Sequence, residues 1–176
     1  MTKISVFWRN ISRPCLLAAG LVAALGALAS GFTLPPASAP LPDFQVLSTS
    51  GQAKSSRQLS TRNKWLLIYV EPDCRPCEAA LKVLDKDPAL SNPAQKVIVV
   101  VGGRNAAETQ RFARQFDWLP EASWFADANR QSATALARRG APVIYGIQDN
   151  NIAWSVSGSL SDTNKLAALM LPWIQD

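Results

Sequence analysis

Two unbroken apolar segments constrain the fold of this chain more than any other feature. The first is WLLIYV, residues 65–70, and the second is KVIVVVG, residues 96–102. Continuous runs of β-branched, aliphatic and aromatic residues of this length are typical of strands that are covered on both faces. They therefore predict the buried centre of a sheet whose strands are joined by helices.

The segments around these strands predict an α/β domain with a mixed β-sheet flanked by helices. A helix is expected to begin at the cysteines after the first strand and to run to about Asp87, because Pro88 blocks its continuation. Asn105 with Glu108 three residues on is a capping box, which predicts a helix over 105–118. The periodicity of apolar residues and the positions of turn residues predict strands at 44–47, 123–127, 142–147 and 151–158. The same patterns predict helices at 130–140 and 161–174, and a loop at 48–64.

The N-terminal part of the chain is expected to lie outside this domain. Residues 15–34 contain no charged residue, and a helix of about 20 residues spans the roughly 30 Å core of a bilayer. Basic residues precede this segment and none directly follows it, which predicts delivery of the domain across the cytoplasmic membrane. Residues 1–34 are therefore either a signal anchor or, with cleavage after Ala29, a signal peptide.

Residues 35–42, PPASAPLP, are expected to be a spacer, because a proline-rich stretch neither pairs in a sheet nor continues a helix. The folded domain is expected to span 43–176. The formal charge of the whole chain is +5, but three of the basic residues precede the membrane segment. The others are scattered among acidic residues, so we expect a mixed-charge surface and no nucleic-acid partner.

The chain contains no histidine. This excludes Ser-His and Cys-His hydrolases, and it removes the commonest ligand of transition metals. A CxxCH haem attachment is excluded too, since Glu78 follows Cys77. The third cysteine, Cys15, lies in the expected membrane segment, where it is interpreted as a small buried hydrophobe.

Three interpretations fit Cys74 and Cys77, which stand where the first buried strand runs into a helix. A structural disulfide over so short a loop would contribute only about 2 kcal/mol through chain entropy. A metal site would have to borrow Glu71, Asp73 or Glu78, although Cu(I) accepts two thiolates alone. A redox pair fits the position best, because open α/β sheets bind and react at the carboxyl ends of their strands. We therefore expect no metal and no cofactor besides the disulfide itself.

The redox interpretation gives each residue of CRPC a role. At a helix start, Cys74 would face unpaired backbone N–H groups and the positive end of the helix dipole, with Arg75 beside it. We expect these to lower the pKa of the Cys74 thiol below about 8.5, against the opposing charge of nearby acidic residues. Pro76 suits the first helical turn. Cys77 is expected to be more buried and to serve as the resolving thiol.

Pro142 is the second candidate site residue. It opens a predicted strand after a helix that is expected to end at Gly140, where a proline is permitted and a cis bond can form. Together with an upstream CxPC pair, this predicts a cis peptide bond before Pro142.

Two stretches resemble a known family. PDFQVLSTSGQAKSSRQLSTRNKWLLIYVEPDCRPC, residues 42–77, is similar to the opening of the TlpA/ResA-like, membrane-tethered members of the thioredoxin superfamily. GAPVIYGIQDNNIAWSVSG, residues 140–158, is similar to their proline loop and final hairpin. The resemblance covers about residues 42–174, and it implies a thioredoxin fold.

The resemblance also implies an activity. Cys74 would attack a disulfide, Cys77 would resolve it, and a client's cysteine segment would pair with the backbone at Ala141 and Pro142. The expected activity is that of a protein disulfide oxidoreductase, acting as a reductant or isomerase on cysteine-containing envelope proteins. Its expected place is the periplasmic side of a bacterial cytoplasmic membrane, held through residues 15–34. The client and the exchange partner that recharges the pair are not determined by the sequence.

The chain departs from the family pattern at three positions. Asp73 stands where the family usually has Trp, Ala80 stands where many members have Glu, and Ile68 stands where thioredoxins bury an aspartate. A buried carboxylate that moves the proton of the resolving thiol is therefore missing unless Glu71 or Glu78 replaces it. These departures keep a second interpretation open, a binding or assembly factor of an envelope complex with a passive CxxC.

Overall fold

The structure is a computed structural model that describes residues 38–85, 96–158 and 162–175. The expected membrane segment, residues 35–37 of the spacer and the predicted helix end near Asp87 lie outside these residues. Within the described part of the chain, no helix is both long enough and apolar enough to cross a bilayer.

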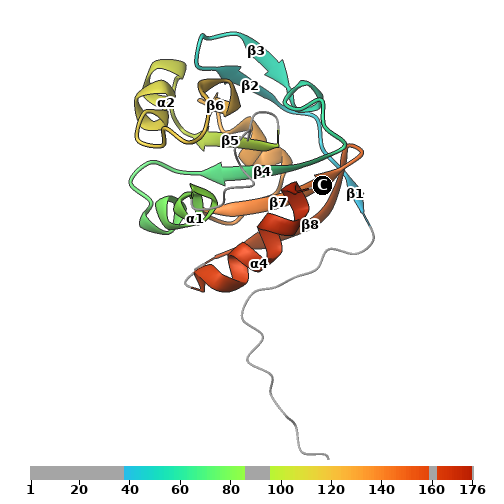
Figure 1. Cartoon of the computed structure of the whole chain (residues 1–176). Coiled ribbons are helices and arrows are strands. Elements are labelled where there is room, and N and C mark those ends of the chain that lie inside the picture. The colour runs from blue at the N-terminus through green and yellow to red at the C-terminus, as the bar shows by residue number, and fades with distance from the viewer. Residues whose placement is uncertain (1–37, 86–95, 159–161, 176) are drawn as a thin grey trace, which may run out of the picture.

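Eight strands of the described residues form a single mixed sheet with the order β1-β8-β7-β4-β5-β6-β2-β3 (Figure 1). The strands are β1 (Ala39–Pro40), β2 (Gln45–Ser48), β3 (Ala53–Ser55), β4 (Lys64–Val70), β5 (Val97–Gly102), β6 (Trp124–Asp127), β7 (Val143–Gln148) and β8 (Asn151–Ser157). The helices are α1 (Arg75–Asp85), α2 (Ala106–Ala113), α3 (Gln131–Ala135) and α4 (Thr163–Ile174), with 3₁₀ turns η1 (Ser56–Gln58) and η3 (Glu121–Ser123).

The two apolar segments form the centre of this sheet, as predicted. β4 pairs in parallel with β5 and antiparallel with β7, and β5 pairs in parallel with β6. Every residue of β5 is buried, and every residue of β4 after Lys64 is buried. Strands that are covered on both faces in this way match the continuous apolar runs of the sequence.

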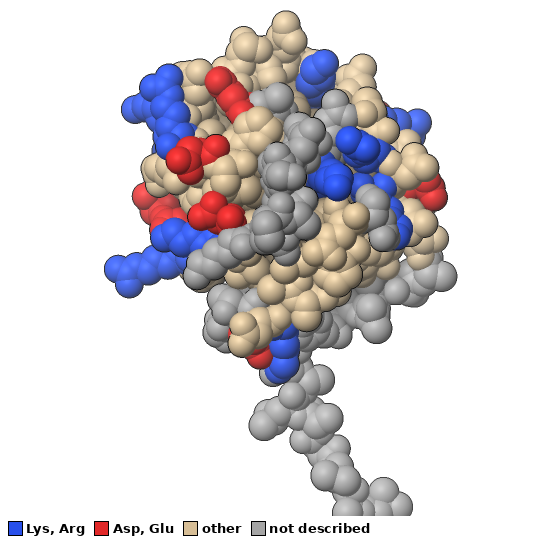
Figure 2. All heavy atoms as spheres, viewed as in Figure 1, with Lys and Arg blue, Asp and Glu red and all other residues tan. Residues whose placement is uncertain are grey.

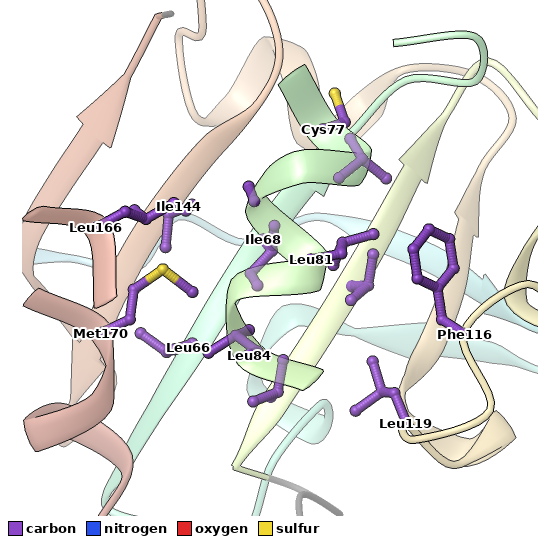
Figure 3. Packing of buried hydrophobic residues seen from close by; sticks show 14 of the residues in the cluster. Leu66, Ile68, Cys77, Leu81, Leu84, Phe116, Leu119, Ile144, Leu166 and Met170 are labelled. Atoms are coloured by element: carbon purple, nitrogen blue, oxygen red, sulfur yellow. The ribbon is translucent and has the colours of Figure 1, made fainter. Parts of the chain in front are cut away.

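Side chains of β4 alternate between two core layers. Leu66, Ile68 and Val70 pack in the layer that α1, α2 and α4 cover. Figure 3 shows α1 over β4 and β5, with α4 on one side of it and the segment that follows α2 on the other. The alternate residues of β4, which are Trp65, Leu67 and Tyr69, pack in the opposite layer. This layer is covered by α3 and by residues of the segment 41–59.

Two short strands correct the prediction for the N-terminal segment. Ala39 and Pro40, predicted to be unable to pair, form β1 at the edge of the sheet against β8. An edge strand tolerates proline because one side of its backbone needs no partner. Part of the predicted loop is β3, which returns along β2 through a turn at Gly51, whose φ is 83°. A glycine adopts this left-handed conformation at no steric cost.

The later elements match the prediction in type, but two helices are shorter than expected. α2 has the predicted capping box at Asn105 and Glu108, yet it ends at Ala113 and not at residue 118. Phe112 and Phe116 still meet, with ring centres 5.4 Å apart, because tighter turns follow the helix. α3 ends at Ala135 and not at Gly140. The β7–β8 hairpin and the amphipathic α4 are confirmed.

Candidate active site

The site lies where β4 turns into α1. Asp73 adopts a left-handed conformation with φ 59°, which turns the chain so that Cys74 stands at the N-terminal end of the helix. The backbone N–H of Cys77 donates hydrogen bonds to the carbonyl oxygen of Cys74 at 2.9 Å and to its Sγ at 3.2 Å. The sulfur of Cys74 thus occupies the position of a helix-capping side chain, at the helix start where the sequence placed this residue.

Cys74 and Cys77 form a disulfide whose Cα atoms are 5.2 Å apart. Cys77 is fully buried in the core layer that α1 covers, whereas Cys74 is half-buried and packs against this layer. Arg75 and Pro76, between them, are exposed in the first turn of the helix. The predicted difference in burial is confirmed, and it leaves Cys74 as the sulfur that an external group can approach.

The segment before β7 lies beside this site. The peptide bond between Ala141 and Pro142 is cis, as predicted. β7 pairs with β4 up to Val143 opposite Tyr69, so continuation of this register places Ala141 level with Glu71. Ala141 and Cys74 both pack against the core layer that α1 covers. The sequence-predicted site residues therefore lie together at the end of the sheet where β4 ends and β7 begins.

The sequence reasoning missed a polar cluster at this end of the sheet. Glu71 accepts hydrogen bonds from Arg130 at 2.8 Å and from Arg138 at 2.7 Å. Burial alone would raise the pKa of Glu71, but the hydrogen bonds and charges of the two arginines outweigh it and lower this pKa. Glu71 is therefore ionised at neutral pH and held by arginines, so it does not carry a proton for Cys77. No spacing in the sequence marks this cluster.

The other carboxylates near the site differ in environment. The side chain of Asp73 is 94% exposed and lies 3.6 Å from Arg104. At this distance and exposure an ion pair contributes little to the stability of the fold. Asp127 is buried, but its oxygens accept bonds from the backbone N–H groups of Gln131 and Ser132 at the start of α3. Figure 2 shows acidic and basic side chains interspersed over α1 and α2.

Two of the three positions that depart from the family pattern, Ile68 and Ala80, carry apolar side chains in apolar surroundings. Ile68 and Ala80 are fully buried in the same layer as Cys77. Among the described residues, no group of three or more Cys, Asp and Glu side chains is placed to hold a metal ion. The surroundings of Cys77 are thus those of a hydrophobic core.

We expect Glu71→Gln to lower the free energy of unfolding by about 1 to 3 kcal/mol at pH 7, because it removes charge-assisted bonds to a buried arginine. The pKa of Glu71 in the folded protein is below its ordinary value of 4.5. Its contribution is therefore complete above that value and is lost as the pH falls through the lowered pKa. Urea unfolding of both proteins at pH 7, 5 and 3 measures this.

Asp73→Asn is the matched control, since it makes the same change at an exposed carboxylate and should shift stability by less than about 0.5 kcal/mol. A difference between wild type and Glu71→Gln that stays constant from pH 7 to pH 3 would contradict the ion-pair assignment.

This arrangement of a central parallel pair, a helix that starts at a cysteine pair, and a final hairpin followed by a helix is the thioredoxin fold. No protein-family model matches the sequence, and no curated protein matches it either. Solved structures do match it in shape.

A secreted disulfide oxidoreductase of Mycobacterium tuberculosis, described as homologous to DsbE of E. coli, has a TM-score of 0.57 at 16% identity, over 73% of this chain and 95% of that chain. A candidate thiol:disulfide interchange protein DsbE of Chlorobium tepidum has a TM-score of 0.60 at 17% identity, over 79% and 98%. A candidate protein disulfide isomerase of Bacteroides thetaiotaomicron has a TM-score of 0.62 at 16% identity, over 83% and 94%. These likenesses establish the fold.

Proposed function

We propose that this protein is a thiol-disulfide oxidoreductase that exchanges disulfides with cysteine-containing proteins. The observation that carries the proposal is the asymmetric disulfide at the helix start, with Cys74 approachable and Cys77 buried behind it. The names of the structurally similar proteins, which include a disulfide oxidoreductase and thiol:disulfide interchange proteins, support it.

In the reducing direction, the Cys74 thiolate attacks one sulfur of a client disulfide, and the other client sulfur leaves as a thiolate. The Cys77 thiolate then attacks the Cys74 sulfur of this mixed disulfide. The client leaves with both cysteines reduced, and the two electrons it gains come from the pair, which returns to the Cys74–Cys77 disulfide. In the disulfide form the backbone N–H of Cys77 donates to the Cys74 sulfur, so a hydrogen-bond donor already stands beside the proposed attacking atom.

We propose the direction of reduction or isomerisation, because the family that the sequence resembles mostly acts in this direction. The site is proposed to act outside the cytoplasmic membrane, with residues 1–34 as anchor or cleaved signal. Cysteine-containing envelope proteins would be its clients, and a second thiol-disulfide protein would recharge it. A measured reduction potential near the strongly oxidising value of about −120 mV would overturn the direction.

Replacement of Cys77 by Ser tests the proposed function in cells. The variant can attack but cannot resolve, so we expect covalent adducts of Cys74 with clients on a gel run without reductant. The matched control is the double replacement of Cys74 and Cys77 by Ser, which should give no adduct. Mass spectrometry of the adducts identifies the clients.

A second candidate function is that of a binding or assembly factor with a passive cysteine pair. The apolar burial of Ile68 and Ala80, together with an exposed Asp73 before the first cysteine, favours it. It predicts no adduct in the trapping experiment and an unchanged phenotype when both cysteines become Ser.

A further inference from the structure

Arg138 joins the strand that enters the cysteine site to the loop that enters β7. Its Nη2 donates to Glu71 at 2.7 Å and to the hydroxyl of Tyr69 at 3.1 Å, both at the end of β4. Its Nη1 donates to the carbonyl oxygen of Gly140 at 2.6 Å, and its guanidinium carbon lies 3.8 Å from the centre of the Tyr69 ring. One side chain therefore fixes the distance between Glu71 and Gly140.

The space for this arrangement is built into the neighbouring strand. A Cβ atom at residue 102 of β5 would overlap the hydroxyl of Tyr69, so a glycine at this position lets the ring lie where Arg138 reaches it. Burial raises the pKa of Tyr69 although Arg138 opposes this, so the hydroxyl keeps its proton at neutral pH. The cluster is thus a packed unit of strand, ring and guanidinium.

Fold stability by itself is a poor explanation for Arg138. Its side chain is only 6% exposed, and its Nε–H is buried without a hydrogen-bond partner among the described residues. Such a group costs free energy, and an apolar side chain in place of a buried ion pair is often as stable or more so. What the arginine achieves, and an apolar residue could not, is a directed bond to the Gly140 carbonyl.

We propose that Arg138 is a positioning residue for client binding, which rests on the proposed function. It holds the backbone at Gly140 and Ala141 at a fixed place relative to Cys74. A client segment that pairs with this backbone presents its disulfide to Cys74 in line for attack only when the backbone at Gly140 and Ala141 is correctly placed relative to Cys74. A misplacement of about 1 Å can cost about 10²-fold in rate. A small disulfide does not use the loop and does not need this placement.

The test compares a peptide disulfide with a small one. The proteins, in the reduced form, are wild type, Arg138→Met and Arg138→Lys. Each is mixed either with a disulfide-bonded peptide that carries several residues on each side of the bond or with the neutral bis(2-hydroxyethyl) disulfide. The second-order rate constant of oxidation is measured from acid-quenched samples, and the half-saturating peptide concentration from its concentration dependence. Arg139→Met is the matched control, because Arg139 is exposed and has no ion pair or hydrogen bond within the described residues.

We expect Arg138→Met to lower the rate constant for the peptide by about 10- to 100-fold, mainly through a higher half-saturating concentration. Its rate constant with the small disulfide should stay within about twofold of wild type, and Arg139→Met should change neither rate. Arg138→Lys should recover only part of the peptide rate, because an ammonium cannot make the forked contacts of a guanidinium. If Arg138→Met does not fold, Arg138→Lys decides by the same comparison.

Equal slowing of both disulfides, or slowing of neither, would overturn the positioning role. A wild type that reacts with neither disulfide contradicts the proposed function instead. In that case amide hydrogen exchange tests separately whether Arg138 holds the loop. Arg138→Met should then speed exchange in the segment 139–143 by at least about tenfold if the bond to Gly140 holds this loop, and unchanged exchange would count against it.

Discussion

Replacing Cys74 with Ser is expected to lower the rate constant of disulfide exchange by at least about 10³-fold, because a serine hydroxyl is almost fully protonated near neutral pH and a thiolate is the nucleophile. The half-buried position of Cys74 makes its sulfur the only one of the pair that a client disulfide can approach from solvent. Oxidation of the reduced protein by bis(2-hydroxyethyl) disulfide, followed in acid-quenched samples, measures the rate constant.

Cys77→Ser is the matched control for this loss. It should keep the first attack and stop at one equivalent of mixed disulfide on Cys74, because the resolving thiol is absent. A Cys74→Ser protein that retains more than about a tenth of the wild-type rate constant would show that Cys77 attacks directly, and it would reverse the assignment of the two roles.

Ile68→Asp is expected to lower the free energy of unfolding by about 3 to 5 kcal/mol at pH 7, or to prevent folding. This change would place a carboxylate where thioredoxins bury an aspartate. Ile68 is fully buried in an apolar layer with Cys77, so the new charge would lose its hydration without gaining a partner. Urea unfolding measures the loss, and it should shrink at low pH because burial raises the pKa of the introduced carboxyl.

Ile68→Val is the matched control for this substitution. It removes one methyl group from the same site and should cost only about 0.5 to 1.5 kcal/mol. A loss of less than about 1 kcal/mol for Ile68→Asp would mean that the layer beneath α1 already offers polar partners to a carboxylate. The chain would then differ from thioredoxins only in the side chain at position 68, and not in the surroundings of that side chain.

The predictable part of the fold is the part that local patterns specify. β4 and β5 were predicted correctly because strands covered on both faces must be apolar throughout. β1 and β3 were missed because each has only two or three residues, and such short edge strands form only where a partner strand is already in place. The ends of α2 and α3 were misjudged because helix propensity continues past the residues at which packing ends each helix.

The candidate site divides in the same way. Cys74, Cys77 and Pro142 could be chosen from the sequence because each sits at a recognisable junction between a strand and a helix or loop. The contacts of Arg138 with Glu71 and Tyr69 could not be chosen, because they join residues that are 67 and 69 positions apart. Arg138 and Glu71 look like ordinary surface charges in the sequence, and only the pairing of β4 with β7 brings them together.

The sequence by itself determined a buried sheet, a cysteine pair at a helix start and the exclusion of histidine chemistry, because these depend on residue type and on spacing along the chain. The tertiary structure alone decided that Glu71 is held by two arginines, that Cys77 has apolar surroundings, and that one buried side chain fixes the loop beside the site. Burial, ion pairing and the pKa of a carboxylate depend on which residues meet across the fold, and sequence spacing does not specify these contacts.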